Sequence, residues 1–145
     1  MSDTLERARE IMARVHNMHI LATVDDDGQP HCRWMGALVE DPASPWTFYL
    51  ACGKQSRKMS QIAANPKAQL VFSDETKWEV ATLSGLAVAE EGAEPRQWLF
   101  DAVPMMKKYY SGPDDEKMGV IKFKVKCLEI LAMHENREPV CLDLE

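Results

Sequence analysis

The residues best suited to chemistry form a short basic run, 53–58, which contains Lys54, Ser56, Arg57 and Lys58. Its setting is unusual, because positions 42–73 hold no aspartate or glutamate in a chain of net charge −6. A helix is predicted to begin within this run, and its first N–H groups would add about half a positive charge to the side-chain donors. The run therefore predicts an anion site, and a phosphate fits these donors. The alternative is a solvated helix end, and charge alone does not decide between the two.

Arg33 is the second candidate, and it lies in the segment His31-Cys32-Arg33-Trp34-Met35-Gly36. It follows a run of alternating apolar residues, and a guanidinium cannot be buried without partners. Arg33 either lies exposed on the outer face of a sheet or reaches the same anion as Arg57 and Lys58.

Other kinds of chemistry find little support in the residue patterns. The four cysteines form no CxxC pair and the four histidines form no HxH or HExxH pattern, so we expect no metal site. Reduced thiols are expected, because cytosolic chains rarely hold structural disulfides. Asp25-Asp26-Asp27 is expected to be a solvated turn, since no EF-hand spacing follows it. No nucleophile with a base and no carboxylate pair can be assigned, so the catalytic residues stay unknown.

The elements that must position these residues are mostly strands. Helical spacing predicts helices over 4–16 and 56–64, and helical pieces over 93–110 with a break at Pro104. Apolar alternation predicts strands at 19–24, 30–39, 46–52, 69–72, 77–88 and 121–127. Gly85 is expected to mark a bulge, and the lysines at 122, 124 and 126 predict a strand near a sheet edge.

The strands follow one another as hairpins, which favours a mainly β (α+β) fold, a six-stranded antiparallel barrel with short helices. At 145 residues we expect one domain: a helix at 4–16, the barrel at about 19–132, and an acidic tail without a period at 133–145. The net charge of −6 argues against a nucleic-acid or anionic-membrane partner. No apolar run approaches the roughly 18 residues of a membrane span, so a cytoplasmic protein is expected.

The order of these motifs resembles that of the FMN-binding split β-barrels, the pyridoxamine 5′-phosphate oxidase-like proteins. The resemblance rests on segments 20–24, 28–33, 48–50, 56–58 and 64–68, and it covers roughly residues 5–130. Residues 109–115, with the sequence YYSGPDD, look closest to the general stress protein branch of that family.

The resemblance implies a homodimer with FMN in clefts at the subunit interface. The cofactor-binding residues that it implies come from three segments: the flavin-flanking strand Arg33, Trp34, Met35 and Gly36; the pair Ala51 and Cys52; and the phosphate-binding Ser56, Arg57 and Lys58. Cys52 stands where a threonine is common in the family, and it lacks the hydroxyl donor.

Three departures argue against oxidation of vitamin B6. True pyridoxamine-phosphate oxidases carry a substrate-gripping lysine where this chain has Ala37-Leu38, and Gln and Arg near Val80 and Thr82. Their C-terminal Trp and Arg are replaced here by an acidic tail. The expected function is therefore that of an FMN-dependent oxidoreductase whose small-molecule substrate is unknown. The alternative is a non-catalytic barrel that binds or sequesters flavin or haem, and a deazaflavin in place of FMN also stays open.

Overall fold

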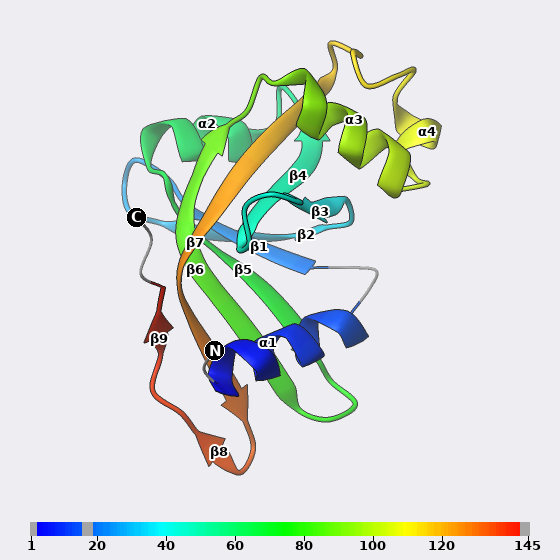
Figure 1. Ribbon diagram of the computed structural model, residues 1–145. Coiled ribbons are helices and arrows are strands. Elements are labelled where there is room, and N and C mark those ends of the chain that lie inside the picture. The colour runs from blue at the N-terminus through cyan, green and yellow to red at the C-terminus, as the bar shows by residue number, and fades with distance from the viewer. Residues whose placement is uncertain (1–2, 16–18, 143–145) are drawn as a thin grey trace.

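The computed structural model describes residues 3–15 and 19–142, and their main element is a single curved antiparallel sheet (Figure 1). Seven strands follow one another across it in the order β2-β1-β5-β6-β7-β4-β3, and the short strands β8 and β9 pair with β7. The elements in chain order are α1 (Asp3–Arg14), β1 (His19–Val24), β2 (Pro30–Met35), β3 (Leu38–Glu40), β4 (Thr47–Gly53), α2 (Arg57–Ala64), β5 (Lys67–Asp74), β6 (Glu79–Ala89), α3 (Ala93–Ala102), α4 (Met106–Tyr109), β7 (Met118–Ala132), β8 (Glu135–Asn136) and β9 (Val140–Cys141).

The expected fold class is confirmed as mainly antiparallel β with short helices, but the expected count of six strands is wrong. The predicted strand 30–39 is two strands, because the chain turns at Gly36-Ala37 between them. β2 pairs with β1 at one end of the strand order, whereas β3 pairs with β4 at the other end. This short link therefore joins the two edges of the sheet and partly closes the barrel. The first helix ends at Arg14, and its expected end at 16 lies outside the described residues.

Two hydrophobic clusters explain why β4 reads as one continuous apolar run. Phe48, Leu50 and Cys52 point into the barrel, where they join the main core. Tyr49 and Ala51 point the other way, into a smaller cluster with Leu99 of α3, Met106 of α4 and residues of β7. Because both faces of β4 are covered, every residue from Thr47 to Cys52 is buried, and only Gly53 at the end is exposed.

The predicted bulge at Gly85 is confirmed. The pairing of β6 with β7 shifts register between Ser84 and Gly85, and a Cβ on Gly85 would lie 2.0 Å from the carbonyl oxygen of Lys124. The lysines of β7 do alternate with buried residues, but the expectation of an edge strand is wrong. β7 lies between β6 and β4, so its lysines mark a solvated face and not an open edge.

The C-terminal segment corrects two further expectations. The tail was expected to lack a period, yet residues 135–136 and 140–141 form β8 and β9 against β7. Cys127 and Cys141 form a disulfide between β7 and β9, so the expectation of reduced thiols is wrong for this pair. The N–H of Leu142 bonds to the carbonyl of Lys126, so these two residues form a hydrogen-bonded pair of the ladder. The adjacent pair, Cys127 and Cys141, is then a non-hydrogen-bonded pair, the kind in which facing side chains come closest. Cys32 and Cys52 are free thiols, and the cytoplasmic location stays a prediction.

Helix α1 packs across β5, β6 and β7 and is fixed there by paired charges (Figure 1). Arg7 bonds to Glu79 and Glu135, and Arg14 bonds to Asp74 and Glu79. None of the described helices is long and apolar enough to cross a membrane.

Candidate functional site

The first turn of α2 is open at its N-terminus. Ser56 holds the N-cap position with extended backbone, but its hydroxyl donates to the carbonyl of Gly53 at 2.7 Å and caps no helix N–H. The helix therefore begins with N–H groups that no side chain satisfies, as an anion site requires. Arg57 and Lys58 follow directly, and the first turn contains no acidic residue.

Arg33 of β2 reaches across β1 to α2 and meets only neutral acceptors. Its guanidinium donates to the carbonyl of Leu21 at 3.0 Å, to the hydroxyl of Thr23 at 2.9 Å and to the amide oxygen of Gln61 at 2.9 Å. No carboxylate within residues 3–15 and 19–142 pairs with it, and burial lowers the pKa of this guanidinium. A half-buried cation thus keeps its full charge uncompensated, which favours a nearby anion.

The buried thiol of Cys52 is influenced by three other predicted site residues. Burial raises the pKa of Cys52, and the charge of Lys58, the hydroxyl of Ser56 and the charge of Arg33 all act in the opposite direction. All three groups therefore act on the same thiol. Four of the nine predicted site residues converge at this end of the barrel: Arg33, Cys52, Ser56 and Lys58.

Of the other five predicted residues, Arg57 adjoins this group in the first turn of α2, and the remaining four lie around it. Trp34 is 72 % exposed on the outer face of β2, whereas Met35 on the next position is buried in the core. Gly36 lies in the link between β2 and β3, and Ala51 faces the cluster under α3. Arg57 is exposed and lines a shallow depression with Asp25 and Asp26.

Three residues near this site were not predicted from the sequence: Thr23, Gln61 and Tyr110. Thr23 is fully buried and its hydroxyl donates to Gln61 at 2.6 Å. Gln61 is a buried polar residue beside the apolar face of α2, a signal that could have been noticed. The pKa of Tyr110 is raised mainly by burial and also by the charge of Cys52.

The segment 111–118 lies beside this site and overlaps residues 109–115, which resemble the general stress protein branch. Arg96 of α3 donates to three of its backbone carbonyls, those of Pro113, Asp115 and Met118. The N–H of Lys54 bonds to the carbonyl of Lys117 at 2.9 Å, which joins this segment to the turn before α2. The segment 111–118 is therefore fixed to α3 by Arg96 and to the basic turn by a backbone bond.

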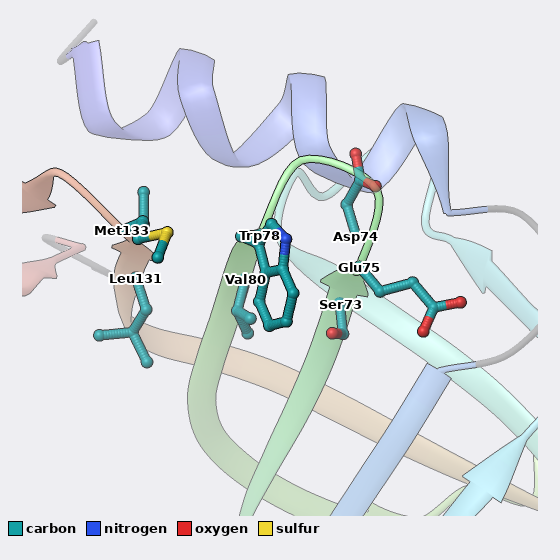
Figure 2. A pocket seen from close by; sticks show the side chains of 8 residues that line it. Ser73, Asp74, Glu75, Trp78, Val80, Leu131 and Met133 are labelled. Carbon is teal, nitrogen blue, oxygen red and sulfur yellow. The ribbon is translucent and has the colours of Figure 1, made fainter.

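Two other features contain none of the predicted site residues, and the first of them borders the site, since Asp25 and Asp26 line the same depression as Arg57 and Gln61. The carboxylates of Asp25, Asp26 and Asp27 lie within 4.8 Å of one another, but Asp25 already accepts from the N–H groups of Asp27 and Gln29. An apolar hollow of about 400 Å³ lies near α1, where Trp78 and Val80 stand between Leu131 and Met133 on one side and Asp74 on the other (Figure 2). No predicted site residue lines that hollow. Trp78, expected within a strand, lies in the turn before β6.

Comparisons with solved structures show the same fold elsewhere. A protein related to general stress protein 26 from Clostridium acetobutylicum gives a TM-score of 0.81 at 20 % identity, over 98 % of both chains. A NimC/NimA family protein from the same organism gives 0.76 at 23 % identity, over 96 % of this chain and 92 % of that one. A haem-binding protein from Mycobacterium smegmatis gives 0.76 at 21 % identity, over 97 % of this chain and 59 % of that one. At these identities the likeness concerns the fold alone.

A comparison with curated proteins gives no match. The family model described as pyridoxamine 5′-phosphate oxidase matches residues 5–131, which include the whole candidate site. The chain therefore belongs to the pyridoxamine 5′-phosphate oxidase family.

Proposed function

We propose that the chain is an FMN-binding flavoprotein whose phosphate site consists of Arg33, Ser56, Arg57, Lys58 and the open N-terminus of α2. The observation that carries this proposal is the uncompensated charge of Arg33, which is held by neutral acceptors only, one of them on the helix that carries Lys58. A phosphate dianion would accept charge-assisted hydrogen bonds from these groups and neutralise them.

The flavin ring fits the strand that carries Arg33. β2 pairs only with β1 within the described sheet, so its outer row of N–H and C=O groups is free to bond to a polar ring edge. The backbone of Arg33, Trp34, Met35 and Gly36 supplies this row of groups. Met35 can contribute only through its backbone, because its side chain lies in the core. Cys52 would contribute the neighbouring wall from β4, while Ala51 beside it could contribute only its backbone, because its side chain faces the cluster under α3.

A second copy of the chain is proposed to cover this edge, giving a homodimer with the cofactor between subunits. The exposed indole of Trp34 supports this, since a large apolar side chain at 72 % exposure on an edge strand is suited to a partner surface.

Bound FMN would supply hydride and single-electron chemistry, for an oxidoreductase whose substrate is unknown. The chain's own residues bind the phosphate, orient the ring and exclude water. No general acid or base is assigned. Ala37 is buried and Leu38 is apolar, so a second phosphate anchor of the kind a vitamin B6 phosphate needs is missing there, and oxidation of that substrate is not proposed.

The second candidate is a barrel that binds flavin or haem without turnover. The similarity in fold to a haem-binding protein favours keeping it, because the fold accommodates that cofactor there. A deazaflavin with a phosphate would use the same basic groups as FMN.

The visible spectrum of the purified protein separates these candidates. Flavin bands that NAD(P)H bleaches would support the oxidoreductase, and flavin bands inert to reductants would support the binding protein. A Soret band would point to haem. A colourless protein that gains no absorbance shift on titration with FMN would contradict both flavin proposals.

A further inference from the structure

Gln61 connects the two halves of the proposed phosphate site. It lies on α2, one turn after Arg57, and only 8 % of the residue is exposed. Its amide oxygen accepts from the hydroxyl of Thr23 at 2.6 Å and from the guanidinium of Arg33 at 2.9 Å. The side chain thus ties the helix that begins with Ser56-Arg57-Lys58 to the strand that carries Arg33.

The chemical type of this connection is unexpected. A carboxylate of the same shape would accept the same two hydrogen bonds and would bind a guanidinium more strongly. The chain uses carboxylates for this purpose elsewhere: Arg9 bonds to both oxygens of Glu40, at 2.5 and 2.7 Å. At Arg33 it uses an amide, a hydroxyl and a carbonyl, which fix the guanidinium but leave its charge in place.

We propose that Gln61 is a positioning residue of the phosphate site, which orients Arg33 toward the bound anion without cancelling its charge. The inference rests on the proposed FMN function. On this account an uncharged side chain at position 61 matters for the affinity for the phosphate and not for the stability of the fold. A carboxylate at this position would hold Arg33 more strongly but would repel the phosphate.

The near-isosteric substitution Gln61→Glu tests this, because it keeps the oxygen that accepts both bonds, adds a negative charge and replaces only the amide NH2. FMN and riboflavin affinities are measured by flavin fluorescence for the wild type and Q61E, at low and high salt, together with thermal midpoints. Gln69→Glu is the matched control, since Gln69 is exposed on β5, where it donates to the hydroxyl of Ser84. Gln61→Met is the second variant, which removes the acceptor.

We expect Q61E to weaken FMN binding by about tenfold or more, with riboflavin affinity and the thermal midpoint unchanged or the midpoint raised. The salt dependence of FMN binding should also become shallower, since one cation fewer acts on the phosphate. Q61M should weaken FMN binding and lower the midpoint. Q69E should match the wild type.

FMN binding by Q61E equal to that of Q69E would overturn the role of Gln61 while leaving the FMN proposal standing. A wild type that binds no FMN would overturn both. A Q61E protein with a lowered midpoint and equally weakened binding of FMN and riboflavin would show a structural role alone, and would also overturn the inference.

Discussion

The arginines at the two ends of the barrel have different kinds of hydrogen-bond partner. At the end covered by α1, Arg7, Arg9, Arg14 and Arg137 each bond to at least one carboxylate. At the end covered by α2, Arg33 bonds only to neutral oxygens, and Lys58 stands in a helix turn that has no acidic residue. The same side-chain type is neutralised where it holds the fold together and left charged where an anion is proposed to bind.

Arg96 shows that a neutral environment does not by itself indicate a ligand. Its three bonds all go to backbone carbonyls of the segment 113–118, whose chain path they fix. Arg33 differs because it shares its surroundings with Lys58, Ser56 and an uncapped helix N-terminus. What distinguishes the proposed site is the convergence of several unsatisfied positive groups.

The largest expected effect comes from releasing the C-terminal strands at the paired end. Cys141→Ser opens a loop of 14 residues, and we expect a loss of about 3 kcal/mol in the free energy of unfolding from loop closure. FMN affinity should stay near that of the wild type. Denaturant unfolding checks this, with Cys32→Ser, an exposed free thiol, as the control. Equal stability of the two variants would show that the disulfide contributes nothing to folding.

The next effect concerns the charged end alone. Arg57→Ala combined with Lys58→Ala should weaken FMN binding by about tenfold or more, roughly 1.4 kcal/mol, because two cations of the proposed phosphate site are lost. Isothermal titration with FMN measures this. Lys107→Ala with Lys108→Ala removes two exposed charges of α4 and should leave the affinity unchanged. Equal affinities of the two double variants would contradict the phosphate assignment.

The smallest effect is a pH dependence at the paired end. The hydrogen bond from Arg7 holds the pKa of Glu79 below its usual 4.5, and that from Arg14 holds the pKa of Asp74 below its usual 3.8. Both carboxyl groups have a lower pKa in the folded protein than in the unfolded chain. Their contribution to stability is therefore complete above the unfolded-state pKa values, and it is lost as the pH falls below about 4.5 and through the lowered folded-state pKa values. Unfolding curves between pH 7 and 3 should show this decline. Glu79→Gln should flatten it, and an unchanged slope would show that these pairs are not responsible.

The sequence was sufficient for the fold class, most elements and the bulge, because these depend on local spacing. The helix over 57–64, the break near Pro104 and the shift at Gly85 each follow from a short pattern. The extra strands were not predictable in the same way. β3 separates from β2 because it pairs with β4, and β8 and β9 exist only through contacts with β7.

The proposed site was predictable in its charges but not in its supporting contacts. A run without acidic residues identified Ser56, Arg57 and Lys58, an arginine after an apolar alternation identified Arg33, and the resemblance to a family added Cys52. Nothing in the spacing indicates that Thr23 and Gln61 would share the guanidinium of Arg33, since those bonds join residues up to 38 positions apart. The disulfide was missed for the same reason, because it depends on the register of β9 against β7.

The preference of the wild-type protein for FMN over riboflavin tests the central claim most directly. The two ligands share the ring and differ in the phosphate, so their affinity ratio reports the contribution of the unpaired cations. We expect FMN to bind about tenfold or more tightly at low salt, with the advantage shrinking as salt screens the phosphate. Equal affinities at low salt would contradict a phosphate site at the α2 end of the barrel.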